Sequence, residues 1–190
     1  MTETYFDEET FKGVDFTQKK LVKGEYDNCT FINCNFSKIH ASNIQFIECE
    51  FVGCNFSNTI VKNSAFKTVN FVNCKLVGVN FSEVDPFLFK VSYKNCQLNF
   101  ASFYQLKLSG TIFRKCNLEA ADFTEAFVNK TIFEESTLKN AIFDQTHLEQ
   151  SDFRTATDFS IDADKNYLKG AKFSKENIIG LLHKYQIIVA

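Results

Sequence analysis

Residues 26–37 read YDNCTFINCNFS, and residues 46–57 read FIECEFVGCNFS, so an aromatic residue stands at every fifth position of both stretches. The same spacing of apolar residues runs back to Phe6 and forward to Phe81. We call these residues the centres. A period of five fits neither an α-helix, with 3.6 residues per turn, nor a β-strand, with two. It predicts a chain that turns a corner every five residues.

The period resumes after a break, two residues out of phase. The second series of centres comprises Leu88, Tyr93, Leu98, Phe103, Leu108, Phe113, Leu118, Phe123, Val128, Phe133, Leu138, Phe143, Leu148 and Phe153, followed by Leu168 and Phe173. Of the 23 Phe residues in this chain of 190, 18 are centres, and there is no Trp and only one Met. A demand for Phe at equivalent positions is typical of a repeat protein, and the length suits one domain.

The residue two positions before each centre is usually small. All seven Cys residues occupy this position: Cys29, Cys34, Cys49, Cys54, Cys74, Cys96 and Cys116. Because side chains two apart in an extended segment share a face, the centre and the small residue both point inward. We expect the Cys residues to pack as small apolar groups and not to bind a metal. The other three positions of each pentad are expected to face water.

The alternation of the centres indicates how many sides each coil has. From Tyr93 to Phe153, aromatic and aliphatic centres alternate strictly, which gives a period of ten residues. Like residues then stack in successive coils only if each coil holds an even number of pentads. We therefore predict an all-β solenoid with four sides and 20 residues per coil, in which Phe51 and Phe133 are fully buried in Phe stacks. Both ends of such a solenoid require caps.

Two segments depart from the repeat. The break at 82–88 contains the only proline, Pro86, and predicts either a bulge that resets the register or a projecting partner contact. Residues 175–184 read as a short amphipathic helix and residues 186–189 as a strand. We therefore divide the chain into a solenoid over 1–174 and a capping and dimerisation segment over 175–190. The expected dimer contacts are Ile178, Ile179, Leu181, Leu182, Ile187 and Ile188.

The strings CTFINCNFS, CEFVGCNFS, CNLEAADFT and SGTIFRKCNLEAADF resemble the A(D/N)Lxx pattern of pentapeptide-repeat proteins, over about residues 6–175. This resemblance implies a right-handed quadrilateral β-helix. The segments YDNCTFINCNF, VDPFLFKVSYKNCQL and YLKGAKFSKENIIGLLHKYQIIVA are also similar to the Qnr quinolone-resistance proteins and to an immunity protein against a gyrase-poisoning microcin. That likeness implies a C-terminal helix and strand forming a two-fold dimer, and a rod that binds DNA gyrase or topoisomerase IV. Two projecting loops found in some Qnr proteins are missing here.

No sequence feature points to catalysis. The chain has no Walker loop, no G-x-G-x-x-G and no H-E-x-x-H motif. His40 and His147 each precede a centre and should point outward, and His183 lies in the expected cap. We therefore expect a protein that is not an enzyme and that needs no cofactor or metal.

Charge and hydropathy limit the partners. The formal net charge of −2 argues against a generally basic nucleic-acid binder. The acidic start, MTETYFDEETFKG, lacks the features of a signal peptide, and no apolar run has the length of a membrane helix. The odd number of Cys residues suits a reducing compartment. We expect a cytoplasmic protein with no membrane partner and no direct nucleic-acid contact.

The most informative surface feature is an acidic region from Glu119 to Asp164, where eleven acids and three bases give a local net charge of −8. The candidate partner-binding residues are Glu119, Asp122, Glu125, Glu134, Glu135, Asp144, Glu149 and Asp152. Rows of acids on a rod could imitate DNA phosphates and attract a basic DNA-binding surface; a solvated surface is the alternative. Together with the Qnr likeness, DNA mimicry by these acids predicts protection of a type II topoisomerase from quinolone-like or peptide poisons. The alternative function is a structural or scaffolding module with another partner.

Overall fold

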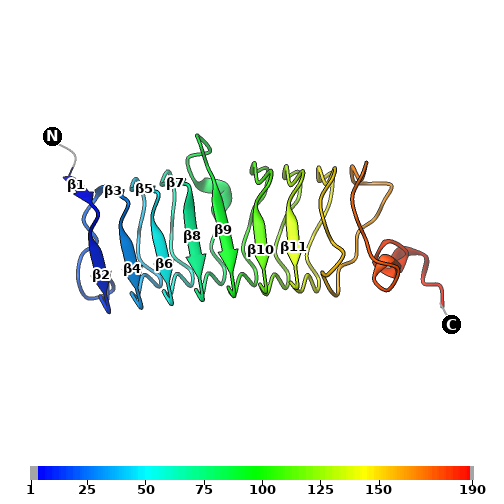
Figure 1. Ribbon diagram of the computed structural model, residues 1–190, viewed down its shortest axis with the longest axis horizontal. Coiled ribbons are helices and arrows are strands. Elements are labelled where there is room, and N and C mark those ends of the chain that lie inside the picture. Colours follow the sequence, from blue (N-terminus) through cyan, green and yellow to red (C-terminus); the bar gives the residue numbers. More distant parts are fainter. Residues whose placement is uncertain (1–3, 189–190) are drawn as a thin grey trace.

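The computed structural model describes residues 4–188, which form a rod of stacked coils (Figure 1). Its strands form two parallel sheets. The first sheet has the order β1 (Thr4–Asp7), β3 (Gly24–Asp27), β5 (Gln45–Ile47) and β7 (Ala65–Lys67). The second has the order β11 (Ile132–Glu134), β10 (Ile112–Arg114), β9 (Val91–Lys94), β8 (Val69–Val72), β6 (Glu50–Val52), β4 (Thr30–Ile32) and β2 (Thr10–Lys12).

The register of the sheets confirms the four-sided coil. Phe11 lies opposite Phe31, and Phe31 lies opposite Phe51, so equivalent residues of successive coils are 20 positions apart. Four pentads therefore make one coil. The two sides without named strands are joined by isolated parallel bridges, such as Asn35 to Asn55.

We name the four sides by their centres. Side A carries Phe6, Tyr26, Phe46, Phe66, Leu108, Val128, Leu148 and Leu168. Side B carries Phe11, Phe31, Phe51, Phe71, Tyr93, Phe113, Phe133, Phe153 and Phe173. Side C carries Phe16, Phe36, Phe56, Leu76, Leu98, Leu118 and Leu138, and side D carries Leu21, Ala41, Val61, Phe81, Phe103, Phe123 and Phe143.

The core is a set of aromatic stacks that run along the rod. On side B, neighbouring ring centroids from Phe11 to Phe173 lie 4.7 to 5.4 Å apart. Rings of opposite sides meet edge to face in the middle of the coil, as Phe123 of side D and Phe133 of side B do at 5.8 Å. Phe51 and Phe133 are both fully buried, as predicted. The small residues fill the corners: all seven Cys residues are buried.

Most corners contain a left-handed residue two positions after the centre. Asn28, Asn33 and Asn73 have φ of 50°, 52° and 56°, and Gly53 and Gly78 stand at equivalent places with φ of 65° and 68°. Asn and Gly tolerate this conformation better than other residues. Other residues also take this conformation at the same position, for example Lys115 and Glu135 with φ of 53° and 49°. The repeated left-handed conformation, and not one residue type, turns the chain at these corners.

The break shifts the register by two residues. Ala65 still lies opposite Asp85, 20 residues on, but Phe71 lies opposite Tyr93, 22 residues on. The extra residues therefore fall between Asp85 and Val91, slightly later than the predicted 82–88. In Figure 1 the chain just before β9 projects beyond the neighbouring coils, after the short 3-10 helix η1 (Phe81–Glu83).

The prediction that Leu88 is a centre is wrong. Its side chain is 64% exposed and its φ is +56°, because the inserted residues carry it out of the coil. Phe89 packs against the core instead, with its ring centroid 6.4 Å from those of Phe66 and Phe81.

The expected helix over 175–184 is present only as two short 3-10 helices, η2 (Ile178–Leu181) and η3 (His183–Tyr185). The Asn177 side chain donates hydrogen bonds to the carbonyl oxygens of Phe153 and Ala156, at 2.6 and 3.0 Å, and so fixes the start of this segment on the last coil.

The expected strand over 186–189 is not formed at 186–188, since Gln186 turns into the left-handed region at φ 52°; position 189 lies outside the described residues. The segment still covers the end of the solenoid, because Leu181 packs against the core. No helix found within residues 4–188 has the length and hydropathy needed to cross a membrane.

Candidate partner-binding surface

The eight candidate acids do not form one face, because the coil distributes them over all four sides. Three belong to side B, three to side D or its edge, one to side C and one to side A. The side B acids are Glu134, Glu135 and Asp152; the side D acids are Asp122, Glu125 and Asp144; Glu119 follows a side C centre and Glu149 a side A centre. The 20-residue coil itself implies this distribution, because residues share a side only within a pentad or at intervals of one coil.

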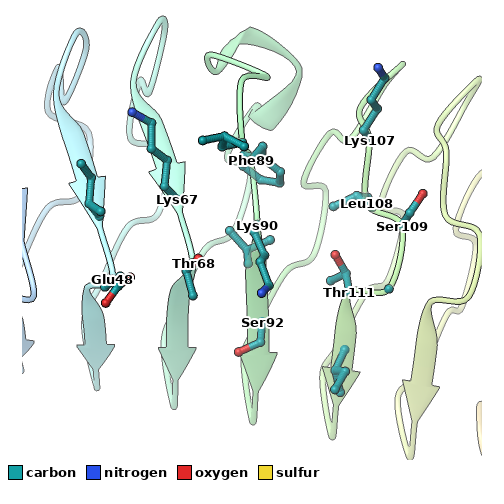
Figure 2. A pocket seen from close by; sticks show the side chains of 15 residues that line it. Glu48, Lys67, Thr68, Phe89, Lys90, Ser92, Lys107, Leu108, Ser109 and Thr111 are labelled. Carbon is teal, nitrogen blue, oxygen red and sulfur yellow. The ribbon is translucent and has the colours of Figure 1, made fainter.

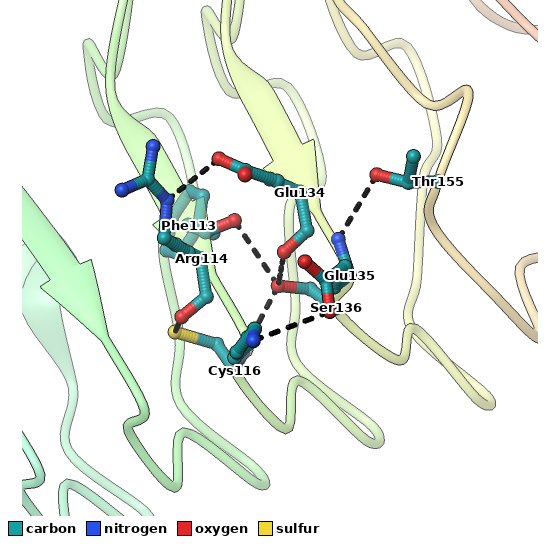
Figure 3. Close-up of polar contacts among 8 residues, drawn as sticks. Phe113, Arg114, Cys116, Glu134, Glu135, Ser136 and Thr155 are labelled. Atoms are coloured by element: carbon teal, nitrogen blue, oxygen red, sulfur yellow. Dashed lines mark hydrogen bonds and ion pairs between the residues drawn. The ribbon is translucent and has the colours of Figure 1, made fainter.

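The side B acids are paired with bases, and Figure 3 shows the pair of Arg114 and Glu134. The Arg114 Nε donates to Glu134 Oε2 at 2.6 Å, and the Lys115 ammonium lies 3.5 Å from Glu135. Arg154 contacts Asp152 at 2.7 Å, and its hydrogen bonds lower the pKa of the Asp152 carboxyl. Side B therefore presents nearly balanced charge and contributes little attraction for a basic partner.

Side D holds the acids that lack such partners. Asp122, Glu125 and Asp144 are part-exposed, and none forms an ion pair with another residue of the described chain. The Asp122 carboxylate accepts a hydrogen bond from the Thr124 backbone N–H at 2.9 Å, and the Glu125 carboxylate accepts one from the Gln105 side-chain amide at 2.7 Å. These neutral donors orient the carboxylates without cancelling their charge.

The remaining two acids lie on the other two sides of the rod, Glu119 on side C and Glu149 on side A. Glu119 lies 3.7 Å from the Lys139 ammonium. Glu149 lies 3.5 Å from His147, whose ring stacks between Phe127 and Tyr167 at centroid distances of 4.5 and 4.4 Å.

The small corner residues have a second role that the sequence reasoning missed. Their side chains donate hydrogen bonds to the carbonyl oxygen of the centre in the previous coil: Cys74 Sγ to Phe51 at 3.2 Å, and Ser136 Oγ to Phe113 at 3.1 Å. Ser136 Oγ also accepts from the Cys116 N–H at 3.0 Å (Figure 3). The recurrence of Cys, Ser and Thr, all of which carry a donor, was the available signal.

The Cys thiols lie in buried positions of the core, where they have a structural role. Burial raises the pKa of Cys49 to about 12 and also raises the pKa of Cys29 and Cys34. All seven Cys residues are free thiols. Within residues 4–188, no cluster of three His, Cys, Asp or Glu side chains has the geometry to hold a metal ion.

A pocket of about 620 Å³ opens on side A, where the inserted residues disturb the stacking (Figure 2). It lies along Phe89 and Lys90 of one coil and Lys107, Leu108 and Ser109 of the next. Its lining contains no hydrogen-bonded pair of a nucleophile and a base, which is the arrangement that a catalytic site would require. The pocket is therefore better suited to binding than to catalysis.

Comparison with known families identifies the repeat. Residues 25–86 match the model of a pentapeptide repeat region, and residues 116–154 match the model of pentapeptide repeats in eight copies. Together the two matches cover more than half of the chain. No curated protein matches it in sequence.

Solved structures of QnrB1 share the fold. A trypsin-treated variant of QnrB1, a plasmid-mediated fluoroquinolone resistance protein, has a TM-score of 0.73 at 16% identity, covering 98% of this chain and 92% of that one. A second trypsin-treated variant of QnrB1 has a TM-score of 0.60 at 18% identity, covering 98% of this chain and 100% of that one. HetL, a protein involved in heterocyst differentiation regulation in the cyanobacterium Nostoc, matches at 14% identity with a TM-score of 0.44, covering 90% of this chain and 87% of that one.

Proposed function

This chain is a pentapeptide-repeat protein, and we propose that it acts by binding a type II topoisomerase, DNA gyrase or topoisomerase IV, and protects that enzyme from quinolone-like or peptide poisons. Two things support the proposal: the sequence likeness to the Qnr group and a rod fold shared with QnrB1 over nearly the whole chain. The proposed mode is binding without catalysis.

The observation that carries the proposal is the group of free carboxylates on side D. Asp122 and Glu125 flank the centre Phe123 in one coil, and Asp144 follows the centre Phe143 of the next coil, where adjacent parallel strands are about 4.8 Å apart. Their charge is not cancelled by an ion pair in the described chain. A surface of this kind attracts a basic DNA-binding groove and competes with DNA for it.

Such an attraction acts mainly on the rate of encounter. Charges exposed to water interact over roughly 8–10 Å at physiological salt, so binding should weaken as the salt concentration rises. Complementary charge generally raises the association rate more than it slows dissociation.

A supercoiling assay tests the function. Purified gyrase and relaxed plasmid are combined with a quinolone, and this protein is titrated in. We expect partial protection from drug-stabilised cleavage at low protein concentration and inhibition of supercoiling at high concentration, because the rod and DNA compete for one surface. If drug-induced cleavage and supercoiling are the same at every protein concentration, the proposal fails.

We also propose that two copies meet through the C-terminal segment. Ile178, Ile187 and Ile188 are 49%, 53% and 95% exposed, whereas Leu181 packs against the solenoid core. Of the six predicted contacts, the exposed isoleucines are therefore the ones available to a two-fold partner. Ile179 and Leu182 are part-buried.

Light scattering tests this assembly. Replacing Ile187 and Ile188 by Asp should convert a dimer to a monomer, because the charges would be buried without partners. Ile60→Asp is the matched control, since this isoleucine is 40% exposed on side D and lies in the N-terminal half of the chain, away from the C-terminal segment. A native protein that is already monomeric would contradict the proposal.

A second candidate function is a scaffold with another partner. The observation that favours it is the pairing of the side B acids, which leaves only part of the acidic region unbalanced. Recovery of a stable complex that contains no type II topoisomerase, together with failure in the supercoiling assay, would support this function.

A further inference from the structure

The middle of the rod is basic, whereas the region that follows it is acidic. From Pro86 to Leu118 the sequence contains no Asp or Glu and five bases: Lys90, Lys94, Lys107, Arg114 and Lys115. Arg114 and Lys115 are paired with Glu134 and Glu135. The other three form no ion pair with any residue of the described chain, and two of them, Lys90 and Lys107, line the side A pocket.

The same pocket interrupts the hydrogen-bond ladder of the solenoid. In the next coil, the Phe127 N–H donates to the Leu106 carbonyl at 2.9 Å, and the Phe127 carbonyl accepts from the Leu108 N–H at 2.8 Å. The equivalent N–H and carbonyl of Lys107 have no backbone partner among the described residues, because the chain before β9 has bulged away. The Ser109 carbonyl also lacks the donor that its counterpart, the Asn129 carbonyl, receives from Gly110 at 2.9 Å.

The lining of the pocket combines these polar groups with apolar surface. The accessible apolar surface comes from Leu88 and Phe89 of the displaced coil. Figure 2 shows Phe89 beside Lys90 in this lining. The cavity of about 620 Å³ lies within the range of roughly 300–1,000 Å³ that is common for ligand sites. Glu48 is the one acid in the lining, against the lysines Lys67, Lys90 and Lys107.

We propose that this pocket binds an extended, acidic peptide segment of a partner protein, which takes the place of the missing ladder partner. An extended peptide offers both N–H and carbonyl groups along one edge, as strand addition requires. It can therefore donate to the carbonyls of Lys107 and Ser109 and accept from the Lys107 N–H. Apolar side chains would contact Leu88, which is exposed, and Phe89, which is part-buried, and carboxylates would meet the unpaired lysines. This site is independent of the side D carboxylates and of the topoisomerase proposal.

The choice of a peptide over a simple anion follows from the polar groups that are left open. Two of the three are carbonyl oxygens, which accept hydrogen bonds and repel a phosphate or carboxylate group. A ligand that carries donors as well as negative charge satisfies both the carbonyls and the lysines. A peptide that alternates acidic and apolar residues has this composition.

Fluorescence anisotropy with three labelled pentapeptides tests the proposal. The first is Glu-Val-Glu-Val-Glu, the second has the same sequence with every backbone nitrogen methylated, and the third is Lys-Val-Lys-Val-Lys. We expect saturable binding of the first alone, because methylation removes the peptide's donors and lysines reverse its charge. Equal binding of the methylated peptide, or no binding of the first, would overturn the proposal.

A pair of double variants locates the site. Lys90→Glu with Lys107→Glu should weaken binding of the acidic peptide by about tenfold or more, since the two charges nearest the ligand are reversed. Lys62→Glu with Lys169→Glu changes the net charge equally, at exposed positions outside the pocket. Equal loss of affinity in both double variants would show a nonspecific charge effect and would overturn the site.

Discussion

Replacing Phe133 by Ala tests the stacked core most sharply. The Phe133 side chain is fully buried, and its ring lies between Phe113 and Phe153 at centroid distances of 5.3 and 4.7 Å. It also meets Phe123 and Phe143 edge to face, at 5.8 and 6.5 Å. The substitution leaves a cavity that the neighbouring coils cannot close, because hydrogen bonds on all sides fix their spacing.

The expected loss is large for a single residue. A buried Phe→Ala change typically costs about 3–5 kcal/mol of the free energy of unfolding. Aromatic pairs contribute roughly 0.5–1.5 kcal/mol beyond the buried area, and Phe133 takes part in four, so we expect a value near the upper end of that range. Phe173 is only part-buried at the end of the stack, and its replacement by Ala should cost about 2 kcal/mol.

Guanidinium chloride unfolding, followed by circular dichroism, measures both changes. Lys62→Ala is the control, because this side chain is exposed and should change the free energy by less than about 0.5 kcal/mol. We expect the loss in free energy of unfolding to depend on the number of stacked neighbours. Equal losses for Phe133→Ala and Phe173→Ala would refute this expectation.

Three further substitutions test individual contacts, each by the same unfolding measurement. Ser136→Ala should cost about 1–3 kcal/mol, because it leaves the Phe113 carbonyl without its side-chain donor; an unchanged midpoint would show that this bond is dispensable. Tyr93→Phe should stabilise by about 1 kcal/mol, since the Tyr93 hydroxyl is buried without a hydrogen-bond partner; a loss of stability would reveal a missed partner. Gly180→Ala should cost about 1–3 kcal/mol, because an added Cβ would lie 2.3 Å from the Phe159 ring, and a neutral result would mean that the cap is not tightly packed.

The period of five was enough to predict the sides, the stacks and the inward positions. The period is sufficient because each pentad repeats the same local geometry. The position of one centre, such as Phe51, therefore predicts the positions of the equivalent centres in the other coils. The break was harder to place, because both Leu88 and Phe89 are apolar and either could serve as the next centre. Only the packing of Phe89 against Phe66 and Phe81 decides between them.

The C-terminal segment and the acidic surface show where sequence patterns are insufficient. The apolar spacing around Ile178 fits an α-helix and a 3-10 helix equally, and the bonds from Asn177 to the last coil determine the outcome. The acidic region reads as one charged stretch along the chain. In space, Glu134 and Asp152 are paired with arginines while Asp144 is not, and a one-dimensional charge count cannot separate them.

Association kinetics with immobilised gyrase test the central claim most directly. Three proteins are compared: the native chain, a side D variant with Asp122, Glu125 and Asp144 changed to Lys, and a side B variant with Glu134, Glu135 and Asp152 changed to Lys. We expect the side D variant to associate about tenfold more slowly and the side B variant to remain close to the native protein. Absence of binding by the native chain, or equal slowing in both variants, would contradict the account.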